Sequence, residues 1–193
     1  MQGGCESNTS LTEKSGILPR AAFFIFEELS RLNILGQSIS LSFSAIEIYN
    51  ENIFDLLTSK KQPLNIYNNE IKGLTWIQIK SKEDIIRLTK EASESRRSDS
   101  TQFNSVSSRS HAIFQIRLEK ENSCSIINII DLAGSERSSL SFGGKTKEEI
   151  ELGKRIQNEA NFINKSLTTL GRIINMIGDK NSKMAIPYRE SKL

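Results

Sequence analysis

The sequence is poor in the residues that build disulfide-bonded or zinc-bound folds. Its two cysteines, Cys5 and Cys124, lie far apart in 193 residues and form no CxxC pair. This pattern favours a reducing compartment and excludes a disulfide framework. His111 is the only histidine, which argues against a zinc site made of His and Cys ligands.

Long hydrophobic runs are also missing. A typical apolar run is AAFFIF at 21–26, far short of the ~20 residues needed to cross a bilayer. Residues 1–16 are polar and contain no apolar core of a signal peptide. We therefore expect no membrane insertion and a flexible N-terminal segment at 1–16.

Composition is that of an ordinary globular domain, with 37% hydrophobic and 25% charged residues. The net charge of +3 is too small to indicate a nucleic-acid partner. The charge is uneven, because residues 138–193 contain ten Lys or Arg against six Asp or Glu. This excess points to an acidic partner or, alternatively, to a solvated helix face.

Hydrophobic periodicity predicts intermixed helices and strands, and hence one α/β domain with a central sheet. Helices are expected at 17–32, 82–96 and about 154–177, and strands at 38–50, 112–120 and 125–131. ENIFDLL at 51–57 is expected to form a short helical turn, followed by two short strands around a turn at 68–73.

Thr146 and Glu149 have capping-box spacing. The run SIINIID predicts a strand buried on both faces, and a stripe in the last helix predicts core (Ile163, Leu167, Leu170, Ile174 and Ile177).

An acid ends the apolar strand at 125–131. Asp131 and Gly134 form a D-x-x-G pattern in the sequence IINIIDLAGSER. In open α/β sheets ligands bind at the carboxyl ends of strands. A carboxylate there can hold Mg²⁺ through a water, and a glycine lets a backbone N–H approach a γ-phosphate. D-x-x-G alone is a weak signal, because many loops after strands contain it.

A second polar loop, NSVSSRSH at 104–111, has two adjacent hydroxyls before an arginine. Ser107 and Ser108 suit a loop that reaches over a nucleotide, since a hydroxyl is a good ligand for Mg²⁺ and can orient a water. Arg109 has a possible partner in Glu136, and a salt bridge between them would close the site. The alternative is an ordinary Ser-rich surface loop.

Four motifs together, NSVSSRSH, DLAGSER, NKSLTTLG and PYRESKL, resemble the kinesin motor domain in order and approximate spacing. GILPRA and SAIEIYNENIFDLL also resemble their counterparts, so the likeness runs from about residue 16 to the last residue. It implies a single partial motor domain over 1–193, a P-loop NTPase-like α/β fold with a central sheet flanked by helices. It also implies an ATP hydrolase that moves along microtubules.

The resemblance further implies roles for individual residues. Switch I corresponds to 104–111, with Asn104 at the nucleotide, Ser107 beside the lytic water and Ser108 on Mg²⁺. Switch II corresponds to 131–136, where Asp131 serves Mg²⁺ through water and Gly134 contacts the γ-phosphate. Arg109 and Glu136 would pair to organise proton transfer. ATP and Mg²⁺ are the implied cofactors.

The microtubule is the implied partner, bound through about 138–193. Asn164, Lys165, Arg189 and Lys192 occupy positions that face tubulin in the family. Asn161 and Phe162 stand where many members have a basic residue, so tubulin affinity would depend more on other cations (Lys145, Lys147, Lys154 and Arg155). The implied location is the cytoplasmic cytoskeleton, and LTTLGR and PYRESKL resemble spindle kinesins. Direction, cargo, subfamily and oligomeric state stay open.

No phosphate-cradling G-x-x-x-x-G-K-[ST] motif precedes residue 104. Met1 resembles a position that follows this motif in the family, which predicts a chain without the first strands and the P-loop, poor nucleotide binding and marginal stability. The alternative is a non-catalytic relic that binds microtubules without ATP turnover. Retention of both switch motifs favours the motor.

Three features resemble functional motifs without fitting them. SLSFGGKT at 139–146 ends in GKT, but Ser139 replaces the first glycine, so a basic loop that contacts tubulin is favoured. NKSL has Leu167 where a guanine-reading N-K-x-D motif needs Asp. This argues against the interpretation of the chain as a GTPase. His111 is expected to make structural hydrogen bonds rather than to act in catalysis.

Overall fold

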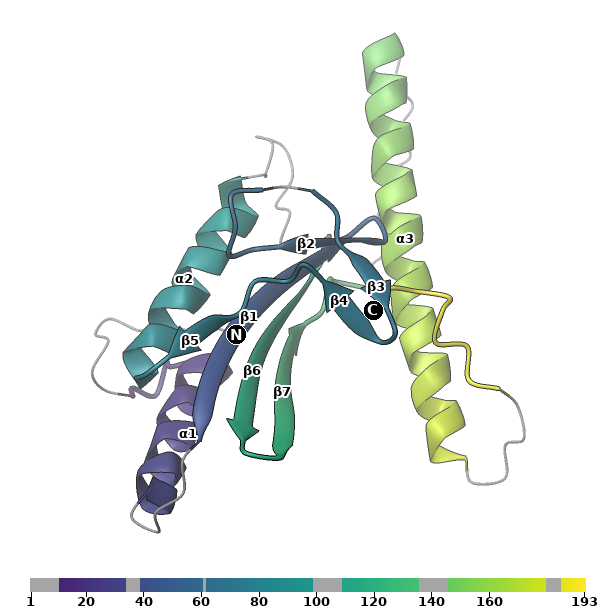
Figure 1. The fold of residues 1–193 in the computed structure, drawn as a ribbon. Coiled ribbons are helices and arrows are strands. Elements are labelled where there is room, and N and C mark those ends of the chain that lie inside the picture. Colours follow the sequence, from purple (N-terminus) through teal and green to yellow (C-terminus); the bar gives the residue numbers. More distant parts are fainter. Residues whose placement is uncertain (1–10, 34–38, 61, 99–108, 136–145, 180–184) are drawn as a thin grey trace.

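The computed structural model describes residues 11–33, 39–60, 62–98, 109–135, 146–179 and 185–193. Its elements are α1 (Ile17–Asn33), β1 (Ser40–Tyr49), β2 (Asn52–Asp55), β3 (Asn65–Tyr67), β4 (Glu70–Lys72), β5 (Ile77–Ile79), α2 (Lys82–Ser98), β6 (His111–Lys120), β7 (Ser123–Asp131) and α3 (Lys147–Gly178). Helices α1 and α2 lie together on one side of the sheet, and α3 stands on the other (Figure 1). The expected α/β architecture is therefore confirmed. The flexibility expected of 1–16 stays a prediction, because 1–10 lie outside the described ranges.

The main sheet has the order β2-β1-β6-β7, with β5 also paired to β1. The pairs within it are antiparallel. Ile48 lies opposite His111, and Ala112 lies opposite Asp131. The start of β6 and the end of β7 therefore lie side by side at one end of the sheet.

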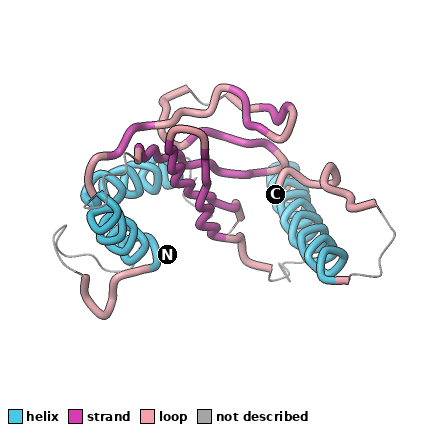
Figure 2. The backbone as a smooth tube through the Cα atoms, turned by 60° about the horizontal axis from the view of Figure 1, so that its bottom comes forward, coloured by secondary structure: helices cyan, strands magenta, loops and turns pink. Residues whose placement is uncertain are grey.

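Alternation along β1 gives the sheet two different faces. Leu41, Phe43 and Ala45 are buried against α1 and α2 together with Phe114 of β6. On α1 the buried residues recur at helical spacing (Leu18, Ala22, Ile25 and Leu29). On the opposite face a smaller cluster forms around Ile46, Ile48 and Ile53, and Leu193 packs against it. The tube view separates the two helix layers (Figure 2).

The helical turn expected at ENIFDLL is wrong. Asn52–Asp55 form strand β2, which pairs antiparallel with β1. Asn50 and Glu51 make the connecting turn with φ of 48° and 58°, the left-handed conformation that a two-residue hairpin requires. Asn is common in the left-handed conformation. The tight turn places Asn52 and the residues after it in register to pair with β1.

The expected burial of β7 is also wrong. Its residues are exposed or half-exposed, including Ile126 at 47% and Ile127 at 40%. The strand pairs only with β6 in the described part of the chain, so its other edge and much of its surface lack a protein neighbour there.

Helix α3 begins earlier than expected, at Lys147, and runs for 32 residues. The predicted capping box is confirmed: Thr146 Oγ1 accepts the N–H of Glu149, and the Glu149 carboxylate accepts the N–H of Thr146. The expected core stripe is wrong: Ile163, Leu167 and Leu170 are only half-buried, and Ile174 and Ile177 are each 59% exposed. The helix stands beside the sheet rather than across it (Figure 1). No helix in the described ranges combines the length and apolarity of a membrane span.

Candidate functional site

Two loops meet at the end of the sheet where β6 begins and β7 ends. Arg109 and Ser110 lead into β6, and Asp131 to Gly134 leave β7, directly opposite. The sequence places the two switch motifs at these points. Several predicted residues lie outside the described ranges (Asn104, Ser107, Ser108, Glu136 and Lys145). Their roles stay predictions.

A buried guanidinium joins the two loops to the sheet and to α2. Arg96 Nε lies 3.3 Å from Glu47 Oε1 and 3.2 Å from Ser110 Oγ, and Nη1 donates to Asp131 Oδ2 at 3.1 Å. Ser110 Oγ donates to Glu47 Oε1 at 2.5 Å, and the Ser110 carbonyl accepts from Arg96 Nη2. Arg96, Glu47 and Ser110 are buried. One cation therefore fixes both loops relative to each other.

Sequence reasoning missed Arg96 and Glu47. Glu47 offered a signal, since it shares its strand face with Phe43 and Ala45, where an apolar residue is expected. A carboxylate in such a position needs a buried cation. Arg96 carried no comparable signal, because it ends a helix rich in charged residues.

A second contact links the residues before β6 to α3. Arg109 Nη1 lies 2.7 Å from Glu159 Oε2, and the Tyr49 hydroxyl donates to Glu159 Oε1 at 2.6 Å. The Glu159 side chain is only 8% exposed. The pairing of Arg109 with Glu136 stays a prediction, since Glu136 is not among the described residues.

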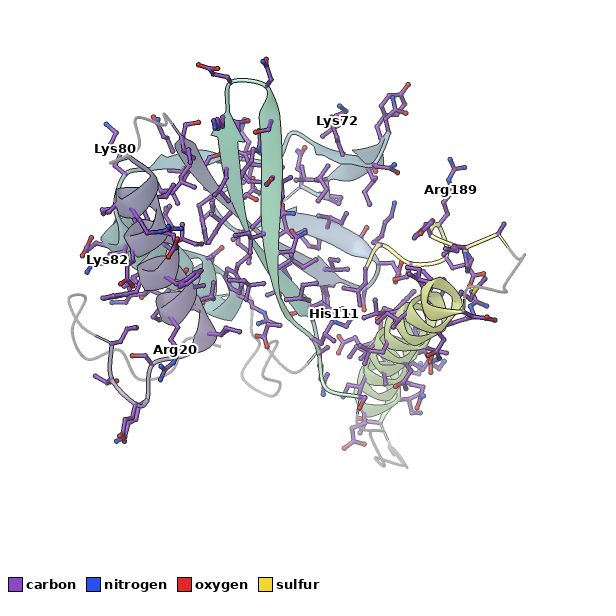
Figure 3. The ribbon with its side chains drawn as sticks, turned by 90° about the horizontal axis from the view of Figure 1, so that it is seen from below. Arg20, Lys72, Lys80, Lys82, His111 and Arg189 are labelled. Atoms are coloured by element: carbon purple, nitrogen blue, oxygen red, sulfur yellow. The ribbon has the colours of Figure 1, made fainter. Side chains whose placement is uncertain are left out.

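His111 links the loop after β7 to α3. The N–H of Ala133 donates to His111 Nδ1 at 3.1 Å, so the proton of the neutral ring lies on Nε2. Nε2 then donates to Ser166 Oγ at 2.8 Å, and Ser166 donates to the carbonyl of Ile163 at 2.8 Å. The structural role expected for His111 is confirmed. Figure 3 shows it between the end of the sheet and α3.

Burial lowers the pKa of His111 below its usual 6.5, and the positive charge of Arg96 adds to this effect, while Glu51 opposes it. The neutral ring is therefore favoured in the folded protein. This agrees with the acceptor role of Nδ1 toward Ala133.

Asp131 and Gly134 suit a phosphate and metal site. The Asp131 side chain is 40% exposed at the end of β7, and one of its oxygens is bound by Arg96. Such a carboxylate can orient a metal-bound water, while the cation behind it disfavours direct coordination. No group of three or more His, Cys, Asp and Glu suited to a metal occurs in the described ranges.

The predicted tubulin-facing residues lie on α3 and on the segment after it. Lys147, Lys154 and Lys165 are exposed on α3, and Asn164 is half-buried. Arg189 and Lys192 are exposed in 185–193, and Arg189 points away from the protein (Figure 3). The side chain of Arg155 lies outside the described part. Asn164 and Lys165 lie within a helix, which is a further argument against a guanine-reading loop.

The sequence matches the kinesin motor domain family over residues 1–193. It is 36% identical over 216 residues to kinesin-like protein KIP1 of Saccharomyces cerevisiae, covering 96% of this chain and 18% of that protein. It is 36% identical over 195 residues to kinesin-like protein Klp61F of Drosophila melanogaster, covering 92% and 17%.

Solved structures agree with this match. The motor domain of the Kar3-like kinesin from Ashbya gossypii aligns with a TM-score of 0.70 and 29% identity, covering 95% of this chain and 55% of that one. The motor and motor homology domains of Kar3Vik1 align with a TM-score of 0.72 and 32% identity, covering 95% and 48%. The chain belongs to the kinesin motor domain family. It spans about half the length of these solved chains and under a fifth of the two relatives named above.

Replacing Arg96 with Met should destabilise the protein by about 3–5 kcal/mol, because it leaves the buried carboxylate of Glu47 without its cation. Urea unfolding followed by circular dichroism would measure the loss. Arg87→Met is the matched control on the same helix, since Arg87 forms exposed salt bridges with Asp84 and Glu91, which contribute little. Equal losses in the two variants would contradict a special role for Arg96.

The low pKa of His111 predicts a stability that falls in acid. Because the folded protein holds the neutral ring, the stabilisation is present above the unfolded pKa of about 6.5 and is lost as the pH falls toward the lower folded value. The difference in unfolding free energy between wild type and His111→Gln should therefore shrink from pH 8 to pH 5. A difference that stays constant over this range would show that His111 does not titrate as stated.

Proposed function

We propose that this chain contains the nucleotide-sensing and microtubule-binding parts of a motor that couples ATP hydrolysis to movement along microtubules. The observation that supports the proposal is that Arg109 and Ser110, before β6, and Asp131 to Gly134, at and after the end of β7, lie together at one end of the sheet. Side chains connect each loop to α3. Membership in the kinesin motor domain family supports the same function.

At the nucleotide end, ATP with Mg²⁺ supplies the phosphoryl group whose γ-position the switches sense. Ser108 and Asp131 would hold the metal, Asp131 through a water, and Gly134 would present its N–H to the γ-phosphate. Asn104 would contact the nucleotide, and Ser107 would orient the attacking water. Arg109 and Glu136 would pair to organise proton transfer.

Two side-chain contacts would carry the change from the nucleotide to α3. Glu159 holds the first switch through Arg109, and Ser166 holds the second through His111 and Ala133. The two helix residues lie two turns apart along α3. A shift of either loop therefore pulls on a different point of one rigid helix.

The other face of α3 fits an acidic surface. At 100° per residue, Lys147, Lys154, Lys165 and Arg172 lie within about 20° of one another around the helix, and Glu159 lies about a third of a turn away. Arg172 pairs with Glu190 in the segment that contains Arg189. This basic stripe of four residues would attract the acidic microtubule surface. The cytoplasmic cytoskeleton, including the spindle, would be its location.

Arg109→Ala and Glu136→Ala should each slow ATP turnover by orders of magnitude while a fluorescent ATP analogue still binds. The measurement is steady-state hydrolysis with and without microtubules, using protein that includes the full motor domain. Arg87→Ala is the control. Unchanged turnover in both variants would overturn the assigned pair. Microtubule binding by wild type without any turnover would favour the non-catalytic relic.

Arg189→Glu should weaken microtubule binding and flatten its dependence on salt, since it reverses a charge that faces an acidic partner. Co-sedimentation at several salt concentrations measures both effects. Lys80→Glu is the matched control, because Lys80 is exposed on the opposite side of the protein, beside α2 (Figure 3). Similar weakening by the two variants would indicate a net-charge effect and contradict a specific contact at Arg189.

A further inference from the structure

Glu51 adopts a backbone conformation that its side chain does not favour. Its φ is 58°, in the left-handed region, where Gly and Asn are common and a longer side chain is strained. The neighbouring Asn50 has φ of 48° and suits the turn. The two-residue turn between β1 and β2 requires this conformation, and Glu51 occupies a turn position where Gly or Asn would be less strained.

The Glu51 carboxylate binds the C-terminal segment across 140 residues of sequence. The Ser191 hydroxyl donates to Oε1 at 2.8 Å, and the N–H of Lys192 donates to Oε2 at 2.9 Å. The N–H of Leu193 then donates to Ser191 Oγ at 3.2 Å. Leu193 packs against the cluster of Ile46, Ile48 and Ile53. Both oxygens of one strained residue thus hold the chain that follows Arg189.

The same segment is attached to α3 on its other side. Glu190 pairs with Arg172, and the N–H of Glu190 donates to the carbonyl of Pro187 at 3.2 Å in a tight turn. Arg189 therefore directly precedes three anchored residues: Glu190, which pairs with Arg172 of α3, and Ser191 and Lys192, which bind Glu51 on the β1–β2 turn. In Figure 1 the segment returns from the end of α3 toward the sheet.

We propose that Glu51 is a positioning residue for microtubule binding: its carboxylate fixes Ser191 and Lys192 so that Arg189 and Lys192 face tubulin beside the basic stripe of α3. The inference rests on the proposed function. Glu51 acts through the segment and does not touch tubulin.

Charge alone predicts the opposite effect, which makes the proposal testable. If Glu51 only repelled the acidic microtubule, removing its charge would tighten binding. A positioning role predicts weaker binding, because the segment loses two charge-assisted hydrogen bonds. We expect Glu51→Gln and Glu51→Gly to raise the Kd for microtubules about tenfold, the order expected when hydrogen bonds to a charged group are lost.

The matched control is Asn50→Gly, which changes the same turn and keeps the carboxylate. It should bind microtubules as wild type does. Glu51→Gly also relieves the backbone strain, so its melting temperature should not fall, which separates a lost anchor from a damaged fold. ATP hydrolysis without microtubules should be unchanged in all three variants. Binding as tight as wild type in both Glu51 variants, or tighter, would overturn the proposal.

A readout without microtubules separates this inference from the proposed function. Glu51→Gly should speed trypsin cleavage after Arg189, whereas Asn50→Gly should not, because only the former frees the segment. Wild-type protein that fails to bind microtubules would overturn the proposed function, with the anchor still visible in the cleavage rates. Cleavage after Arg189 at wild-type rate in Glu51→Gly would overturn the anchor itself.

Discussion

The structure depends on one buried cation. Arg96 lies between Glu47 in the central strand, Ser110 before β6 and Asp131 at the end of β7. A buried guanidinium must have every donor direction satisfied by an acceptor, since an unpaired charge in the interior costs several kcal/mol. The two loops can therefore take few positions relative to the sheet. A site that would sense one phosphate, as proposed above, needs such a fixed reference.

Helix α3 is held to the sheet differently from α1 and α2. The latter two bury an apolar face against the strands, which is non-directional and tolerates only small shifts in a close-packed core. Helix α3 buries Ile156 and makes polar contacts as well, from Glu159 to Arg109 and Tyr49 and from Ser166 to His111. Hydrogen bonds can exchange partners with little loss of buried area. Such attachments suit an element that would change its position while the rest of the domain stays rigid.

Polar contacts also hold the segment 185–193, which follows α3 and would face the acidic microtubule surface. Glu190 and Glu51 anchor it to α3 and to the β1–β2 turn, and Arg189 is exposed directly before the anchored residues. A cation on a flexible strand of chain would lose entropy on binding an acidic surface, and a segment already held in place loses less.

The sequence by itself determined the identity of most elements, the capping box of α3 and the family, because these depend on local spacing and residue chemistry. It misjudged ENIFDLL, since the left-handed turn at Asn50 and Glu51 converts that stretch into a strand. It also misjudged the burial of β7 and of the end of α3, which depends on what lies beside them. Only the tertiary structure decided that Arg96, His111, Glu159 and Glu51 connect distant segments. Such pairs are set by the packing of separate elements, and no local pattern in the sequence specifies which side chains will meet.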